Sequence, residues 1–250
     1  MSTHSLPLPW LEPDHEFPPA SQAWGQDTRA PGLLAAGGTL NTKSLCSAYS
    51  QGIFPWFSDG QPILWWSPDP RMVLEVSEFR LHRTLHRKLQ KFCATSGCEI
   101  RIDSAFAHTV HACSTSPREG QTGTWIVQDM VDAYISLHKA GHAHSVETWV
   151  NGHQIGGLYC VALGKSVFGE SMFSQATDAS KIALAALVSF CRYHDIRQID
   201  CQQNTKHLAS LGAREISRTL FTQQVAEGIV KPTPTWQFLP AYWQTLLTPR

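Results

Sequence analysis

The polar residues best suited to chemistry lie between Val167 and Gln202, in segments that are otherwise apolar. Glu170 stands at the end of one apolar run, while Asp200 and Gln202 lie in another that has the pattern of a strand. Because side chains alternate along a strand, Asp200 and Gln202 are expected to project from the same face. Burying a carboxylate and a carboxamide without partners is costly, so this grouping indicates a site rather than ordinary core.

Size and composition limit the class of protein. The 250 residues, 42% of them hydrophobic, suffice for one large domain or two modest ones. No run of about 18 apolar residues is present, so we expect no membrane span, and residues 1–10 lack a secretory pattern. The seven cysteines form neither a disulfide framework nor a Cys-x-x-Cys motif, which favours a reducing, cytoplasmic compartment.

One segment is strongly basic although the formal net charge of the chain is zero. Residues 80–91 contain arginines, lysines and histidines but no acid. At about 100° per residue, the leucines of this segment gather on one face of a helix and the cations on the other. Such a stripe is either a solvated helix face or a surface for phosphates, and it is compatible with RNA binding.

The order of apolar runs and turn residues indicates an α+β fold with a mixed sheet. Residues 1–30 are Pro-rich and are expected to form a tail or loosely packed arm, followed by a small N-terminal domain over 31–70 and a main domain over 71–250. Strands are expected at 72–76, 99–103, 144–150, 155–163, 166–171, 198–201 and 213–216. Helices are expected at 40–51, 80–91, 105–112, 128–140, 178–193, 205–211 and 217–225.

Three details of the turns and helix ends belong to this prediction. Asn151-Gly152 predicts a tight hairpin between two of the strands. Thr177 or Asp178 is expected to cap the helix over 178–193, and Ser217 to cap the last helix.

Several sequence blocks together resemble one known family. They are Gly52-Ile53-Phe54-Pro55-Trp56-Phe57, Trp65-Trp66-Ser67-Pro68-Asp69-Pro70-Arg71, Phe168-Gly169-Glu170-Ser171-Met172-Phe173-Ser174, Ile199-Asp200-Cys201-Gln202, and the segments 123–126, 141–147 and 207–213. In this order they resemble leucyl/phenylalanyl-tRNA–protein transferase, over about residues 31–221. The resemblance implies transfer of Leu or Phe, and Met less well, from aminoacyl-tRNA to proteins that begin with Arg or Lys. It also implies an N-acetyltransferase-like C-terminal domain and a role in bacterial N-end-rule degradation.

The resemblance gives Glu170, Asp200 and Gln202 the catalytic positions. Asp200 would polarise Gln202, which contacts the attacking amine. A carboxamide is a very poor base, so positioning is favoured over proton abstraction for Gln202. Glu170 would bind the cationic N-terminal residue or help take the proton, and the hydroxyl of the terminal adenosine could relay it. The sequence leaves these alternatives open.

The remaining site residues also follow from the resemblance. The pocket for the transferred side chain would be lined by Leu158, Val167, Met172, Leu184, Leu187 and Ile199. The aminoacyl-adenosine end would be contacted by Trp56, Trp125 and Gly169, and the tRNA backbone by Arg83, Arg87 and Lys88. Two residues depart from the family pattern, since Cys160 replaces a glycine and Leu158 stands where Met is frequent.

The partners follow from the same resemblance. They are Leu-tRNA, Phe-tRNA and protein substrates with N-terminal Arg or Lys, bound by a monomer with no membrane association. The aminoacyl ester is already activated and positioning alone can supply about 7–11 kcal/mol, so neither a cofactor nor a metal is expected.

Four other readings compete with this one. An acetyl-CoA-dependent N-acyltransferase would share the fold, but the turn over 174–179 lacks the Gly-rich loop that cradles a pyrophosphate. A Cys/His hydrolase lacks a nucleophile motif. His142-Ala143-His144 could ligate a metal, although a structural role is favoured because no further spaced ligands are visible. A non-enzymatic RNA-binding module would leave Glu170, Asp200 and Gln202 unexplained.

Overall fold

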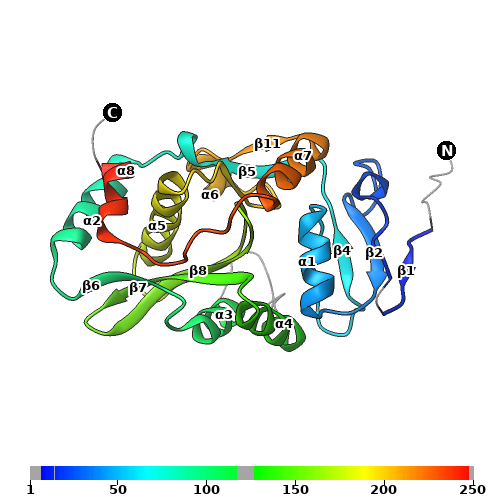
Figure 1. Ribbon diagram of the computed structural model, residues 1–250, viewed down its shortest axis with the longest axis horizontal. Coiled ribbons are helices and arrows are strands. Elements are labelled where there is room, and N and C mark those ends of the chain that lie inside the picture. Colours follow the sequence, from blue (N-terminus) through cyan, green and yellow to red (C-terminus); the bar gives the residue numbers. More distant parts are fainter. Residues whose placement is uncertain (1–6, 14, 117–126, 248–250) are drawn as a thin grey trace.

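Two β-sheets and the helices packed on them make up the described chain. The computed structural model describes residues 7–13, 15–116 and 127–247 (Figure 1). The strands are β1 Trp10–Leu11, β2 Leu33–Gly37, β3 Phe54–Pro55, β4 Leu64–Trp66, β5 Arg71–Glu75, β6 Cys98–Ile102, β7 Ala143–Val150, β8 His153–Leu163, β9 Ser166–Ser174, β10 Gln198–Asp200 and β11 Arg214–Ile216. The α-helices are α1 Thr42–Ser50, α2 Arg83–Ala94, α3 Phe106–Thr115, α4 Gln128–Lys139, α5 Ala179–Tyr193, α6 Lys206–Ser210, α7 Arg218–Ile229 and α8 Gln244–Leu247. No described helix has the length and hydropathy needed to cross a membrane.

The larger sheet carries the residues expected to do chemistry. Its strand order is β11-β5-β10-β9-β8-β7-β6. The β10–β9 pair is parallel and every other neighbouring pair is antiparallel, so the predicted α+β fold with a mixed sheet is confirmed. The β7–β8 turn uses Asn151 and Gly152 at φ 49° and 77°, which the predicted hairpin requires.

Each face of this sheet is covered by different helices. Helix α5 packs against β7, β8 and β9 on one face, while α3 and α4 cover the other (Figure 1). The alternation of strand side chains divides β8 accordingly: Leu158 and Cys160 face α5, whereas Tyr159 and Val161 face α3 and α4. Every residue from Ile182 to Cys191 in α5 is buried, which places this helix inside the molecule rather than on its surface.

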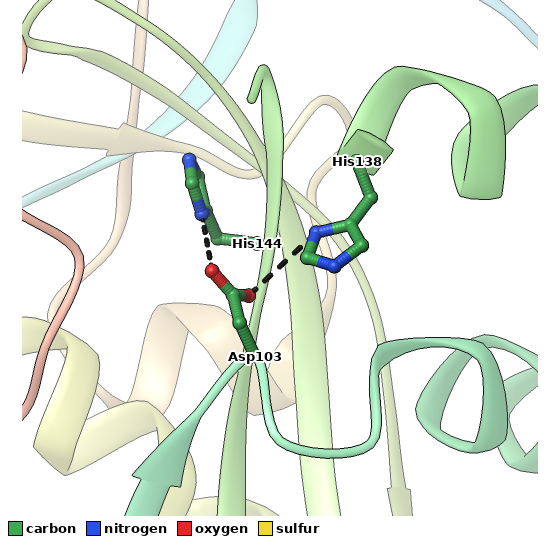
Figure 2. Close-up of side chains that lie close together, drawn as sticks. All are labelled: Asp103, His138 and His144. Carbon is green, nitrogen blue, oxygen red and sulfur yellow. Dashed lines mark hydrogen bonds and ion pairs between the residues drawn. The ribbon is translucent and has the colours of Figure 1, made fainter. Parts of the chain in front are cut away.

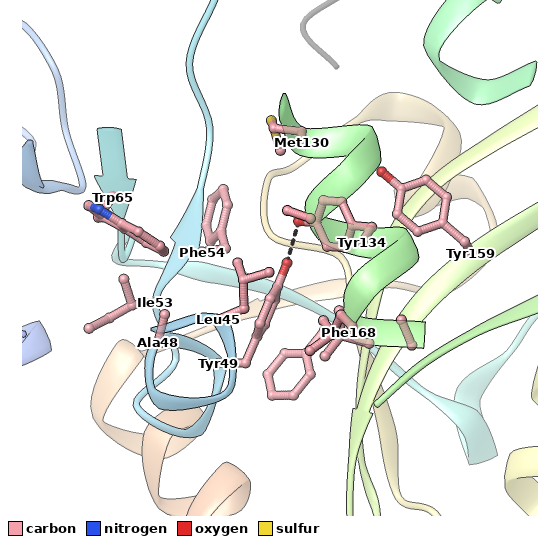
Figure 3. Packing of buried hydrophobic residues seen from close by; sticks show 14 of the residues in the cluster. Leu45, Ala48, Tyr49, Ile53, Phe54, Trp65, Met130, Tyr134, Tyr159 and Phe168 are labelled. Atoms are coloured by element: carbon pink, nitrogen blue, oxygen red, sulfur yellow. Dashed lines mark hydrogen bonds between the residues drawn. The ribbon is translucent and has the colours of Figure 1, made fainter. Parts of the chain in front are cut away.

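The smaller sheet, with order β1-β2-β4-β3, packs beside the larger one. Its core is continuous with the core under α3 and α4. Figure 3 shows α1, through Leu45 and Tyr49, meeting α4 at Met130 and Tyr134. The N-terminal part and the rest of the chain therefore share one core, and the proposed boundary near residue 70 stays a prediction.

The expectation of a loosely packed arm before residue 30 is wrong for its described part. Strand β1 pairs in parallel with β2, and Leu11, Phe17 and Ala23 are buried. The Phe17 ring meets Trp65 edge-on, with ring centroids 4.7 Å apart. Isolated apolar residues among prolines have no periodicity. The sequence pattern therefore did not reveal that a few separate buried side chains hold this segment against the rest of the protein.

Two helix starts differ from their predictions. The basic helix begins at Arg83, because the Arg80 amide donates to the Leu211 carbonyl (2.8 Å) and keeps the preceding residues extended. Helix α5 is capped from a distance by Ser174, whose Oγ accepts from the Ser180 amide (2.8 Å). Asp178 adopts φ 64° and bonds lysines instead of the helix backbone. The Ser217 cap of α7 is confirmed.

Replacing Phe17 with Ala should lower the free energy of unfolding by about 3 kcal/mol or more, because a buried aromatic ring leaves a cavity. Urea unfolding at neutral pH measures this. Trp10→Ala is the matched control, since Trp10 is 64% exposed and should cost less than about 1 kcal/mol. Equal, small effects of both changes would show that the segment is a loose arm after all.

Candidate active site

A cavity opens where the two parallel strands of the large sheet diverge. Strands β9 and β10 pair only at Val167–Ile199 and Phe168–Asp200. Beyond these pairs β9 continues to Ser174, while the chain leaves β10 at Cys201. The space between them forms a cavity of about 420 Å³. This volume lies within the range of small-molecule sites.

Most of the residues predicted for the site meet at this cavity. It is lined by Trp56, Leu158, Gly169, Glu170, Met172, Leu184, Leu187, Ile199, Asp200 and Gln202, together with Phe54, Tyr159, Ser171, Cys201, Gln203, Thr205, His207 and Leu208. Apolar side chains from β8, β9, β10 and α5 thus form one wall, and polar groups from the ends of β9 and β10 form another.

Val167 is a correction to the predicted pocket. Its side chain is buried in the core under α5 but does not line the cavity. Val167 lies two residues before Gly169 on β9, and a strand rises about 3.3 Å per residue, so it sits below the floor of the cavity. Trp125 lies outside the described residues.

Glu170 is held by two tyrosines that sequence reasoning did not identify. The Tyr49 hydroxyl donates to Glu170 Oε1 (2.8 Å) and the Tyr134 hydroxyl to Oε2 (3.0 Å). The two hydroxyls also contact each other at 2.6 Å (Figure 3). Since Tyr49 comes from α1 and Tyr134 from α4, the carboxylate joins the small sheet's helix to the large sheet. No local motif marks either tyrosine.

The environment of Glu170 shifts its ionisation. Burial raises the pKa of Glu170 to about 7, against the lowering effect of the hydrogen bonds from Tyr49 and Tyr134. Burial also raises the pKa values of both tyrosines well above their usual range, so they stay protonated and act as donors. Near neutral pH the carboxyl group can therefore both accept and release a proton.

Asp200 is fully engaged by Arg71, which the sequence analysis did not single out. Arg71 Nε and Nη2 donate to the two carboxylate oxygens at 2.8 and 2.6 Å, and both side chains are 1% exposed. A third donor, Nη1, reaches the Gly52 carbonyl (3.1 Å). The guanidinium also lies between the rings of Phe54 and Phe221, 4.7 and 4.5 Å from their centroids.

Gln202 does not continue the strand of Asp200 as predicted. Strand β10 ends at Asp200, and Gln202 has φ 53°, a left-handed conformation that is uncommon for a non-glycine residue. Its amide donates to Asp200 Oδ1 (2.9 Å), and its Nε2 donates to Glu170 Oε1 (3.1 Å). Asp200 thus holds the backbone of Gln202, while the side chain of Gln202 turns to Glu170.

The basic helix lies apart from the polar wall. Arg83 and Arg87 are exposed on α2, as expected for residues that bind a polyanion. Lys88 instead forms an ion pair with Asp178, which its position within an acid-free segment did not predict. The partner comes from another element, ninety positions along the chain.

Within the described ranges, Asp103, His138 and His144 are the residues that could together hold a metal ion. Figure 2 shows the two imidazoles on either side of Asp103. His144 Nδ1 lies 2.7 Å from Asp103 Oδ2, and His138 Nδ1 lies 2.8 Å from the Ala143 carbonyl. Asp103 Oδ1 accepts from the Ser145 amide (2.8 Å). These facing atoms already have hydrogen-bond partners, so the cluster has a structural explanation as a junction of β6, α4 and β7. His142 is not part of it.

Comparison with known proteins identifies the family. The sequence profile of the leucyl/phenylalanyl-tRNA protein transferases matches residues 73–226, and that of their N-terminal domain matches 38–69. The chain belongs to the leucyl/phenylalanyl-tRNA–protein transferase family. It is 64% identical to the leucyl/phenylalanyl-tRNA–protein transferase of Albidiferax ferrireducens, over 100% of this chain and 98% of the relative. It is 62% identical to that of Polaromonas sp., over 97% and 95%.

Solved structures resemble this transferase more distantly. FemX has a TM-score of 0.45 at 10% identity, over 70% of this chain and 66% of FemX. L-PGS from Bacillus licheniformis has a TM-score of 0.41 at 9% identity, over 78% and 72%. The sequence relatives therefore carry the assignment: the chain is an aminoacyl-tRNA-dependent transferase.

Asp200→Leu and Arg71→Met should each lower the free energy of unfolding of this transferase by about 3–5 kcal/mol, because each leaves the other charge buried without its partner. The double variant Arg71→Met/Asp200→Leu should be closer to the wild type than the sum of the single losses. Urea unfolding of the four proteins gives this coupling directly. Strictly additive losses would mean that the pair has no interaction of its own.

Glu170 should make the native state of the transferase less stable as pH rises. Its folded pKa of about 7 exceeds the ordinary 4.5, so the folded protein binds more protons than the unfolded chain between these values. The stability present below pH 4.5 is therefore lost as the pH rises through 7. Relative to Glu170→Gln, the wild type should lose on the order of 1–3 kcal/mol between pH 4 and 8, allowing for the partial exposure of the group. Chemical unfolding across that range tests this, with exposed Glu227→Gln expected to parallel the wild type.

Proposed function

We propose that the enzyme moves Leu or Phe, and Met less well, from aminoacyl-tRNA to the α-amino group of proteins that begin with Arg or Lys. In the cytoplasm this would mark those proteins for N-end-rule degradation. The observation that carries the proposal is that an apolar wall and the Glu170–Gln202 pair adjoin each other in the same cavity. One wall suits an aliphatic or aromatic side chain, and the other suits an amine.

The apolar wall fits the transferred amino acid. Leu158, Met172, Leu184, Leu187 and Ile199 present branched aliphatic and thioether groups to the cavity. A flexible thioether adapts to groups of different shape, which suits acceptance of both Leu and Phe. Cys160 points into the core under α5 and does not line the cavity, so of the two departures from the family pattern only Leu158 can act on amino-acid preference directly.

Trp56 is suited to hold the terminal adenosine. It lines the cavity beside Gly169, and its carbonyl accepts from Trp66 Nε1 (2.6 Å). The Trp66 ring also packs on Trp56, with centroids 5.5 Å apart. A ring fixed in this way can stack on a base, an interaction worth about 1–3 kcal/mol. We assign Trp125 the same adenosine contact, and Arg83 and Arg87 contacts to the tRNA backbone.

The reaction needs the attacking amine held next to the ester carbonyl, and it needs one proton acceptor. The amine nitrogen attacks the ester carbonyl carbon, an amide bond forms, the ester C–O bond breaks, and the 3′ oxygen leaves as a hydroxyl after taking a proton. A free α-amine has a pKa near 8, and Glu170 at about 7 is close enough to accept its proton efficiently. Gln202 donates to Glu170 through Nε2, which leaves its Oε1 able to accept from the amine.

Asp200 then acts indirectly. Its oxygens are taken by Arg71 and by the Gln202 amide, so it holds the left-handed turn that aims Gln202 at Glu170. We therefore assign Asp200 a positioning role and not the direct polarisation of the Gln202 side chain.

An acetyl-CoA-dependent N-acyltransferase is less well supported. At the start of α5, where a pyrophosphate would need free backbone amides, Ser174 Oγ already accepts from the Ser180 amide.

Transfer itself can be tested with charged Leu-tRNA and a peptide that begins with Arg. Mass spectrometry should show a product with Leu before the Arg, and RNase treatment of the donor beforehand should abolish it. A peptide that begins with Ala is the control for the acceptor. Transfer that resists RNase, or that does not distinguish the two peptides, would contradict the proposal.

Gln202→Ala should lower turnover by more than about 100-fold, about 2.7 kcal/mol in activation free energy, while tRNA binding persists. The reason is that the attacking amine loses a partner without any loss of the pocket. Gln237→Ala is the control, since this glutamine is exposed and does not line the cavity. Turnover near the wild-type value in Gln202→Ala would remove Gln202 from the mechanism.

A further inference from the structure

Helices α2, α5 and α6 lie beside the mouth of the cavity, and specific contacts join α2 to each of the other two. His82, at the start of α2, contacts the Ser210 carbonyl at the end of α6 (2.9 Å). Lys88 of α2 forms an ion pair with Asp178 at the start of α5. Helices α5 and α6 both border the cavity, through Leu184 and His207 respectively. The three helix ends thus form one continuous surface.

Lys181 occupies the edge of the cavity on this surface. It lies three residues before Leu184 on α5, and residues three apart share a helix face. Leu184 lines the cavity, so Lys181 stands about one turn further out. His207 lines the same cavity from α6. The His207 imidazole therefore lines the cavity on this side, and Lys181 lies about one helical turn beyond Leu184.

The surface is basic and accessible. Among the described residues of α2, α5, α6 and their N-cap positions, Asp178 is the one acid. It is only 14% exposed and bonds both lysines, with Lys181 Nζ 2.8 Å from Asp178 Oδ1. The side chains of Lys88 and Lys181 are 42% and 40% exposed. Asp178 thus fixes two ammonium groups side by side, while leaving their outer sides open to an anion.

The His207 imidazole and four cations form a path from the cavity to the basic face of α2. Lys181 and His207 begin it at the mouth, Lys88 continues it, and Arg87 and Arg83 extend it along α2. The donor's aminoacyl group is expected in the cavity, and the single-stranded 3′ end of a tRNA carries one phosphate per nucleotide. A strand that leaves the cavity along this side meets a hydrogen-bonding imidazole at His207 and positive charge at Lys181, Lys88, Arg87 and Arg83.

We propose that Lys181, with Lys88 and His207, binds the phosphates of the single-stranded 3′ end of the tRNA between the aminoacyl pocket and the α2 cations. This rests on the proposed function, because it requires an aminoacyl-tRNA donor. His207 contributes a hydrogen bond rather than a charge, since burial, and secondly Lys181, lower its pKa. Asp178 stays ionised because hydrogen bonds from Lys181 and then Lys88 lower its pKa.

Two aminoacyl donors, one with 3′-end phosphates and one without, distinguish a phosphate contact from every other role of Lys181. Leu-tRNA carries the 3′-end phosphates, whereas 3′-O-leucyl-adenosine carries the same ester without any phosphate. We expect Lys181→Gln to lower kcat/KM for Leu-tRNA by about 5–10-fold and to reduce the slope of log(kcat/KM) against log salt by about 1. With leucyl-adenosine the same variant should stay within about twofold of the wild type.

Lys231→Gln is the matched control, because Lys231 is exposed and lies away from the three helices. It should leave both donors unaffected, and the Tm of each variant should match that of the wild type. An equal loss of kcat/KM with both donors would overturn the proposal, because Lys181 would then act on the aminoacyl group or the fold. An unchanged salt slope with Leu-tRNA would also overturn it. A wild type inactive with both donors would instead refute the proposed function itself.

Discussion

The buried ion pair between Arg71 and Asp200 is the contact on which the geometry of the site depends. It joins β5 to the end of β10 with two hydrogen bonds, and a third from Arg71 reaches Gly52 in the N-terminal part of the chain. The desolvation cost of two buried charges is offset only when every donor and oxygen is well paired. The Gln202 amide also donates to Asp200 Oδ1, so the same pair that joins β5 to β10 also fixes the turn that places Gln202.

A second constraint comes from Glu170, whose partners lie on different elements. Tyr49 is on α1, Tyr134 on α4 and Gln202 after β10, so the carboxyl group stands where the N-terminal part, the helices under the sheet and the diverging strands converge. Burial raises the pKa of Glu170 to near that of the amine it would deprotonate, and the hydrogen bonds from the two tyrosines limit this rise. The acid–base property of the site is therefore set by the packing of the two sheets against each other.

Local patterns predicted the regular elements well, because each has a signal within a few residues. The Asn151-Gly152 hairpin, the Ser217 cap and the mixed sheet are confirmed. The predictions that failed depended on contacts between distant residues. Phe17 packs on Trp65, and the cap of α5 comes from Ser174. Helix α2 begins only at Arg83 because the Leu211 carbonyl accepts from the Arg80 amide. None of these partners lies in the window that a periodicity or capping pattern covers.

The sequence by itself determined the family, and it singled out Glu170, Asp200, Gln202 and most of the apolar residues that line the cavity, because these follow from residue types in a fixed order. Only the tertiary structure decided what each of them touches. It showed that Asp200 is neutralised by Arg71, that Gln202 turns toward Glu170, and that Val167 lies below the cavity. It also paired Lys88 with Asp178. Charge pairing and burial depend on distances between elements, which residue order along a chain does not specify.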